Sequence, residues 1–193
     1  MEETGKKGIK AFFRRRFTAK RIALMAAFVA LSYVVSFLEF PIFPAAPFLQ
    51  LDFGNVFVLL IGFLLGPMEG VLVCFIKESF RLIGSGTGGV GELANFLVTC
   101  SYILLPTVLY VYKKKISWVI VSLCGACLIG VGAALLCNRF LLFPLFFGAG
   151  AAAQFEAFGW FVFGFNLIKT VSVSLLTLLL YKRLSNFLKR WRV

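Results

Sequence analysis

The 193-residue chain contains no histidine and only eight acidic residues. The lack of histidine excludes histidine-dependent catalytic triads and histidine-ligated metal sites. The acidic residues show no close pairing of the kind that two-metal catalysis requires. The glycine-rich stretch 84–91 also lacks the Gly-Lys-Ser/Thr ending of a nucleotide-binding P-loop. Binding or translocation is therefore favoured over an enzymatic reaction, and no metal or cofactor is expected.

Charged residues are also scarce, at 15% of the chain, whereas hydrophobic residues make up 61% and the mean hydropathy is +0.95. With this composition almost every element must be apolar on all sides, which favours a lipid environment over a water-facing surface. We expect an all-α membrane protein in which the helices form one bundle.

Six apolar segments are long enough to be helices, and the second and third are short. We place them at residues 22–38, 53–65, 70–83, 92–112, 116–137 and 159–181. The prolines Pro41, Pro44 and Pro47 prevent a helix between the first two, so this loop is expected to fold back over the outer end of the bundle. The predicted organisation is a basic segment 1–21, a transmembrane domain 22–182 and a basic tail 183–193.

The net charge of +12 would also be typical of a nucleic-acid-binding protein, but the basic residues are concentrated in three clusters. Six spans place all three clusters on the same side of the membrane, which is the positive-inside pattern of a multi-pass cell-membrane protein with cytoplasmic termini. The first apolar segment is expected to be a retained helix and not a cleaved signal peptide. The clusters consist of Lys6, Lys7, Lys10, Arg14, Arg15, Arg16, Lys20 and Arg21; Lys113, Lys114 and Lys115; and Lys182, Arg183, Lys189, Arg190 and Arg192.

The five cysteines lie in or beside predicted helices and give no disulfide framework. Cys124 and Cys127 form a C-x-x-C pattern in the inner half of the fifth helix, beside a reducing compartment. A buried structural pair is the favoured interpretation. A membrane thiol oxidoreductase that uses these two cysteines is the alternative.

Lys169 lies near the middle of the last apolar segment, one helical turn after Asn166. An ammonium at that depth costs at least about 2.5–3.5 kcal/mol on insertion scales, so it requires a partner, water or a polar ligand. Asn95 and Asn138 are expected near the same outer side of the bundle. Asn166 and Lys169 share a helix face, and such a pair of an amide and a cation suits a planar ligand whose edge carries carbonyls and ring nitrogens. Alternatively, Lys169 neutralises an internal carboxylate, for which the candidates are Glu78, Glu92 and Glu156.

The third segment also contains charged residues. Lys77 lies within the apolar run, and Glu78 and Arg81 are spaced i and i+3. This spacing predicts that Glu78 and Arg81 pair with each other.

Small residues repeat at four-residue spacing in the first segment, at Ala23 with Ala27 and at Ala26 with Ala30. Such a strip lets another helix approach closely. Internal packing and the docking of a partner subunit are both compatible with this pattern.

Several short runs, in this order, resemble the riboflavin-specific substrate-binding (S) components of energy-coupling-factor (ECF) transporters. The resemblance covers most of the chain from Arg21 onward and implies a six-helix membrane protein that captures riboflavin outside the cell. It also implies two kinds of partner for inward release, a transmembrane coupling subunit and two cytosolic ATPases. The runs are 48–53, Gly66-Pro67 with Gly70, Lys77, 88–91 with Asn95, and 165–169.

The resemblance also implies roles for individual residues. The loop residues Leu49, Gln50, Leu51 and Asp52 would cover the site, and Asn166 and Lys169 would bind the flavin ring. Asn138 matches a ligand-contacting asparagine, Lys77 and Asn95 match recurrent polar positions, and the alanine strip matches the face toward the coupling subunit. The chain departs from the family pattern at Gln50, Asn55 and Arg139, so a phosphorylated or antibiotic flavin remains an alternative ligand. Another vitamin, or a self-contained carrier, remains an alternative function.

Overall fold

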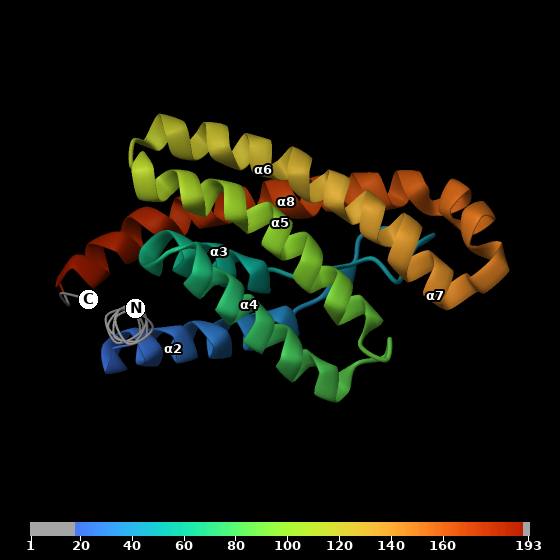
Figure 1. Ribbon diagram of the computed structural model, residues 1–193, viewed down its shortest axis with the longest axis horizontal. Helices are drawn as coiled ribbons and strands as arrows, with labels where there is room; N and C mark the ends of the chain where they lie inside the picture. Colours follow the sequence, from blue (N-terminus) through green and yellow to red (C-terminus); the bar gives the residue numbers. More distant parts are fainter. Residues whose placement is uncertain (1–17, 191–193) are drawn as a thin grey trace, which may run out of the picture.

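The computed structural model describes residues 18–190, which form a bundle of helices (Figure 1). Five of the longer helices are α2 (Ala19–Ser36), α3 (Gly54–Leu65), α4 (Pro67–Arg81), α5 (Val90–Tyr112) and α6 (Ile116–Cys137). A π-helical turn (Asn138–Leu142), the short α7 (Phe143–Phe147) and a 3₁₀ turn (Gly148–Gly150) lead into α8 (Ala151–Arg190). A further 3₁₀ turn, Leu82–Gly84, follows α4. The mostly helical fold agrees with the predicted class.

Helix α3 is the central element of the bundle and packs against α2, α4, α5 and α8. Its sequence, from Gly54 to Leu65, has no charged residue, and nine of its twelve residues are buried. A helix that is apolar on all sides has no face suited to water and is stable only inside such a core. The main hydrophobic cluster accordingly includes Val58, Leu59 and Ile61, which are fully enclosed.

Glycine and proline make the sharp reversal between α3 and α4. Gly66 has a φ of 130°, which an L side chain rarely adopts, and Pro67 occupies the first turn of α4, where its fixed φ suits a helix start. A Cβ atom on Gly70 would lie only 3.1 Å from the Cα of Gly62. The two helices therefore approach at glycine, as small-residue contacts between membrane helices do.

The connection between α2 and α3 differs in one respect from the expected irregular loop. It contains two strands of two residues each, β1 (Phe40–Pro41) and β2 (Gln50–Leu51), which pair antiparallel. An all-α prediction missed this ribbon because two-residue strands leave no periodic signal in the sequence. The segment between them packs over the end of the bundle, and Ala46 is completely buried there.

The predicted bounds of five helices agree with the structure within three residues, but α8 is longer at both ends than the predicted 159–181. Its first residues are good helix formers, and the polar side chains Gln154 and Glu156 interrupt only the apolar run, not the helix. Helix α8 is therefore longer than the apolar run that it contains.

Within residues 18–190, three stretches are long and apolar enough to cross a membrane: Ala19–Ser36, Val90–Tyr112 and Ile116–Tyr181, the last of which includes both α6 and most of α8. Helix α3 is apolar but shorter. These findings support a membrane protein, while the number of spans and the side on which the ends lie stay predictions. The predicted basic segment lies outside the described residues up to position 17, and the predicted tail does so from position 191. These parts include Lys6, Lys7, Lys10, Arg14, Arg15, Arg16 and Arg192, and the side chains of Lys182, Lys189 and Arg190 are not described either.

Candidate functional site

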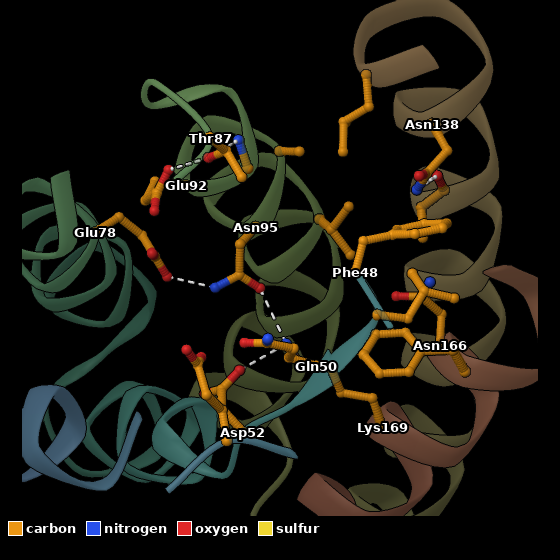
Figure 2. Close-up of a pocket in the computed structure, with 18 of the residues that line it drawn as sticks. Phe48, Gln50, Asp52, Glu78, Thr87, Glu92, Asn95, Asn138, Asn166 and Lys169 are labelled. Atoms are coloured by element: carbon orange, nitrogen blue, oxygen red, sulfur yellow. Dashed lines mark hydrogen bonds and ion pairs between the residues drawn. The ribbon is translucent and has the colours of Figure 1, made fainter. Parts of the chain in front are cut away.

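A cavity of about 220 Å³ lies at the end of the bundle that the α2–α3 connection covers (Figure 2). Its walls come from this connection, from α4, α5 and α8, and from the turn after α6. The apolar part of the lining includes Phe48, Leu49, Leu142 and Phe165. The polar part includes Gln50, Asp52, Glu78, Asn95, Asn138, Asn166 and Lys169. Most of the residues predicted for the site thus meet in one cavity, although they come from distant parts of the chain.

Lys169 is the charged centre of this cavity. Its Nζ donates to Asp52 Oδ2 at 2.8 Å and to Asn95 Oδ1 at 3.2 Å, and it lies 5.9 Å from the centre of the Phe165 ring. An ammonium has three N–H donors, so one remains after these two bonds. The alternative interpretation, that Lys169 neutralises an internal carboxylate, is confirmed, but the partner is Asp52 and the three candidates Glu78, Glu92 and Glu156 are wrong.

Asp52 connects the α2–α3 loop to the rest of the site. Its Oδ1 accepts from the backbone N–H of Gly54 at 3.0 Å, at the start of α3, while its Oδ2 faces Lys169. Burial disfavours the charged form, but the cations Lys169, Lys77 and Arg81 outweigh this effect and hold the pKa of Asp52 below its usual range. The carboxylate is therefore ionised at neutral pH.

Asn138 and Asn166 present acceptors to the cavity. Each side-chain amide donates to the carbonyl four residues earlier in its own helical segment, Asn138 to Ala134 at 2.8 Å and Asn166 to Val162 at 2.9 Å. A carbonyl partner requires the NH₂ end of the amide, which turns the oxygen end away from the backbone. Within residues 18–190 neither Oδ1 has a hydrogen bond, so both can accept from a ligand.

Lys77 lies behind the cavity and does not line it. It is fully buried, its Nζ lies 2.6 Å from Glu78 Oε1, and it donates to Asn55 Oδ1 at 2.9 Å. Asn55 in turn donates to Thr99 Oγ1 at 2.9 Å. Lys77 therefore supports Glu78, which does line the cavity, and extends the polar network into the interior.

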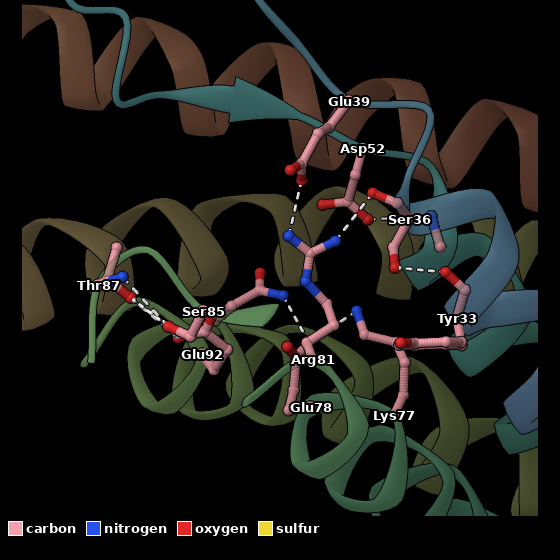
Figure 3. A network of polar contacts seen from close by, with 12 residues as sticks. Tyr33, Ser36, Glu39, Asp52, Lys77, Glu78, Arg81, Ser85, Thr87 and Glu92 are labelled. Carbon is pink, nitrogen blue, oxygen red and sulfur yellow. Dashed lines mark hydrogen bonds and ion pairs between the residues drawn. The ribbon is translucent and has the colours of Figure 1, made fainter. Parts of the chain in front are cut away.

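Arg81 takes partners other than the predicted one (Figure 3). Its guanidinium donates to the backbone carbonyl of Ser36 at 2.8 Å and to Glu39 Oε2 at 2.7 Å. The predicted i, i+3 pair with Glu78 is wrong, because Arg81 reaches across to the end of α2 while Glu78 faces Lys77 and Asn95. Arg81 thus ties the beginning of the α2–α3 loop to the end of α4.

The predicted covering loop has Leu49 and Gln50 in the lining, together with Phe48, which was not among the predicted site residues. The Phe48 ring makes an edge contact with Phe158 of α8, 5.6 Å between centroids. Leu51 does not line the cavity and is buried in the apolar cluster that also contains Leu49 and Phe165. The alternation along the strand explains why Gln50 and Leu51 point to opposite sides.

The glycine-rich stretch 84–91 lies at the mouth of the cavity, where Thr87, Gly91 and Glu92 contribute to the lining. The hydroxyls of Ser85 and Thr87 donate to Glu92 Oε2 at 2.8 and 2.9 Å. This arrangement places a carboxylate at the rim.

Two other predicted features lie away from the cavity. Ala23, Ala26, Ala27 and Ala30 are all exposed on α2, which leaves that face open within the described part of the chain.

Cys124 is exposed and Cys127 is buried, so the expectation of a buried cysteine pair is wrong for Cys124. All five thiols are free, and residues 18–190 contain no group of three or more metal-ligating side chains of the His, Cys, Asp and Glu type.

Comparison with known proteins shows the family. Residues 20–181 match the family model of the ECF transporter substrate-specific component. The chain is 34% identical to the riboflavin transporter RibU of Staphylococcus aureus, covering 89% of this chain and 93% of that protein. It is 31% identical to the riboflavin transporter FmnP of Bacillus subtilis over about half of each chain (49% and 50%). A solved S component of a bacterial ECF transporter superposes with a TM-score of 0.77 at 33% identity, covering 88% of this chain and 98% of that one. The protein therefore belongs to the substrate-specific components of ECF transporters.

Proposed function

We propose that this protein captures riboflavin outside the cell and delivers it inward with an ATP-driven coupling module. The observation that carries the proposal is the Lys169 ammonium, which keeps an unused N–H beside two amide acceptors in a cavity with an aromatic wall. The names of the two relatives, both riboflavin transporters, support the same ligand.

The donors and acceptors of the cavity complement the polar edge of a flavin ring. That edge carries carbonyl oxygens, which accept, and an imide N–H, which donates. The remaining Lys169 N–H can donate to a carbonyl, and Asn138 Oδ1 and Asn166 Oδ1 can accept from the imide. Phe48 and Phe165 supply apolar surface for the ring faces. A flat ring with one polar edge therefore suits this cavity.

The cavity volume supports the proposal that the covering loop moves when the ligand binds. At about 220 Å³ the cavity is smaller than the roughly 300–1,000 Å³ typical of sites for drug-sized ligands. The loop residues Leu49, Gln50 and Asp52 cover it, and Phe48 reaches across to α8. We therefore assign to residues 49–52 the role of a cover that shifts outward and closes again over riboflavin.

In the proposed topology, residues 22–182 form a single transmembrane domain of six spans with both ends in the cytoplasm. The three basic clusters support this orientation, and the loop cluster Lys113, Lys114 and Lys115 directly precedes α6. The cavity then opens to the outside, where the vitamin is captured.

The proposed partners are a transmembrane coupling subunit and two cytosolic ATPases. The exposed alanines of α2 support this assignment, because small residues allow a partner helix to approach closely. Next to Ala26 and Ala30, an apolar groove of about 640 Å³ runs between α2 and α4 and includes Leu72 and Ile76. A partner helix would cover apolar surface there without burying a charge.

Two observations test the proposal. Protein purified from a flavin-containing host, or incubated with riboflavin and desalted, should be yellow and release a fluorescent ligand on denaturation. Liposomes containing only this chain should not accumulate riboflavin, whereas liposomes that also contain the coupling subunit and ATPases should do so with ATP. Failure of the purified chain to bind added riboflavin would contradict the proposed ligand, and uptake by the chain alone would contradict the proposed partners.

A further inference from the structure

A second opening lies on the side of the bundle, at the end where α7 connects α6 to α8 (Figure 1). It is a groove of about 760 Å³ between the last turns of α6, the π-helical turn and the N-terminal part of α8. Its lining is apolar, with Phe140 and Trp160 among the side chains, apart from one cation, Arg139, and one carboxylate, Glu156. Asn138, the residue before Arg139, lines the ligand cavity, whereas Arg139 does not. The π-helical turn therefore faces two separate spaces.

The two charges of the groove have no ion-pair partner among residues 18–190. The Arg139 guanidinium lies over the Phe155 ring, 5.1 Å from its centre, and within this part of the chain its N–H donors have no acceptor. Arg139 and Glu156 are both exposed. A ligand that brings an anion to Arg139 and a cation to Glu156 would therefore pair with both without displacing an existing bond.

The depth of the two charges matches that of lipid headgroups in the proposed topology. Helix α6 has 22 residues, which rise roughly 33 Å at about 1.5 Å per residue, close to the thickness of about 30 Å of the hydrocarbon core of a bilayer. Because α6 begins at the cytoplasmic lysine cluster, Arg139 at its other end lies near the outer headgroups. Glu156 stands just before the apolar run 159–181 and reaches the same level. Trp160 is of a residue type that is enriched at this interface.

We infer that the groove binds an aminophospholipid of the outer leaflet, of which phosphatidylethanolamine is the simplest form. The phosphate oxygens accept from Arg139, whose planar guanidinium matches their geometry, and the primary ammonium donates to Glu156. An acyl chain covers Phe140 and Trp160. This lipid site goes beyond the proposed function, since it depends on the membrane topology and not on the vitamin.

The pair of opposite charges favours this occupant over others. Phosphatidylcholine carries the phosphate, but its trimethylammonium has no N–H donor for Glu156. Phosphatidylglycerol has a net negative charge and no cation, so its headgroup leaves Glu156 without an ion-pair partner. A helix of a partner protein would have to place an acid and a base at the right spacing and depth, whereas an aminophospholipid carries both charges in one headgroup.

Trp160 provides the reporter for a test, because it lines the groove and is 81% exposed. The chain contains three tryptophans, so Trp118→Phe/Trp191→Phe leaves Trp160 as the only one. In neutral detergent micelles, this protein is titrated with phosphatidylethanolamine, phosphatidylcholine or phosphatidylglycerol whose acyl chains carry bromine, which quenches tryptophan fluorescence at short range. Phosphatidylethanolamine should reach half-maximal quenching at an about threefold lower mole fraction than the other two lipids, the size expected of one exposed ion pair.

Variants of the Trp160 reporter protein separate the two headgroup contacts. Arg139→Gln should raise the half-quenching mole fraction of all three lipids by about threefold, because each of them carries a phosphate. Glu156→Gln should abolish the preference for phosphatidylethanolamine. Glu92→Gln is the matched control, since it changes the net charge by the same amount outside the groove, and it should keep the preference. A Trp160→Phe/Trp191→Phe protein, which reports through Trp118 on lipid elsewhere on the bundle, should show no preference for phosphatidylethanolamine.

Several results would overturn the aminophospholipid site: equal half-quenching fractions of the three lipids at Trp160, a preference for phosphatidylglycerol, or a preference that Glu156→Gln leaves intact. Absence of quenching by every brominated lipid would also overturn it, because lipid would then not enter the groove. Thermal unfolding checks that Arg139→Gln and Glu156→Gln retain the fold, and their riboflavin affinity should be unchanged, since neither residue lines the ligand cavity. If a variant does not fold, the lipid preference of the reporter protein still decides. A protein that shows this preference and binds no riboflavin would contradict the proposed function alone.

Discussion

Replacement of Lys169 by methionine separates the two roles that the structure gives to this residue. The ammonium bonds to Asp52 in the covering loop and to Asn95 in α5, and its third N–H is available to the ligand. Methionine keeps much of the length and apolar character of the lysine stem and removes only the charge and the donors. The variant therefore leaves no large cavity in the bundle.

The expected loss of affinity follows from the strength of one charge-assisted hydrogen bond. Such bonds contribute roughly 1.5–3 kcal/mol, which corresponds to a rise of about 10- to 150-fold in the riboflavin dissociation constant. Stability should also fall, because Asp52 loses its ion-pair partner. Removing one member of a buried pair costs about 3–5 kcal/mol, and we expect the lower end of this range, since the Lys169 and Asp52 side chains keep 13% and 7% exposure.

A double-mutant cycle with Asp52→Asn distinguishes loss of the ligand contact from loss of the loop contact. Thermal unfolding in detergent should show that Lys169→Met/Asp52→Asn regains most of the stability that Lys169→Met loses, because no uncompensated carboxylate remains. Riboflavin titration should show that the double variant still binds weakly. A dissociation constant of Lys169→Met within threefold of wild type would refute the ligand contact. Full recovery of affinity in the double variant would show that Lys169 acts only through the loop.

Three further changes test other parts of the structure. Because the pKa of Asp52 is lower in the folded protein than in the unfolded chain, its stabilising contribution is complete above about pH 4 and is lost as the pH falls through its folded-state pKa. The unfolding temperature of the wild type should therefore fall more steeply below about pH 4 than that of Asp52→Asn. Parallel curves for the two proteins would contradict the ion pair. Replacing Ala23 and Ala27 by phenylalanine should leave riboflavin affinity unchanged and prevent co-purification with the coupling subunit. The exposed control Ala152→Phe should change neither riboflavin affinity nor co-purification. An intact complex with the double variant would argue against docking on α2. Arg81→Gln removes the guanidinium that bonds to Ser36 and Glu39 and so ties the loop to α4, and it should raise the riboflavin dissociation rate by roughly three- to tenfold. Release at the wild-type rate in a stopped-flow measurement would show that these bonds do not hold the covering loop closed.

The sequence predicts the helices of this fold well because each long apolar run leaves few alternatives to a membrane helix. It also singles out Lys169, since an isolated ammonium in an apolar run is costly wherever the helix packs. The bounds of α8 were less accurate because the polar residues near its start, such as Glu156, are good helix formers that simply face outward. An apolar pattern measures the environment of a helix and only indirectly its length.

Ion pairing was predicted less well than helix position. The partner of Lys169 is Asp52, which lies 117 residues away, and such a contact depends on how the α2–α3 loop folds over the bundle. Arg81 likewise reaches Glu39, 42 residues away, although Glu78 is only three residues distant. Local spacing on a helix favours neighbours, but these partly buried cations pair with the carboxylate that the tertiary structure brings within reach.

The covering loop is held by cations from two different helices. Arg81 of α4 binds its beginning at Ser36 and Glu39, and Lys169 of α8 binds its end at Asp52. The second tether shares its ammonium with the proposed ligand contact, so a bound ring and a closed loop reinforce each other through one nitrogen atom. A ligand that engages the third N–H of Lys169 rigidifies the group that holds Asp52, while opening of the loop exposes that ammonium to water and weakens its bond to the ligand. Ligand retention and loop closure should therefore be coupled, and Lys169 should influence both the affinity and the release rate of riboflavin.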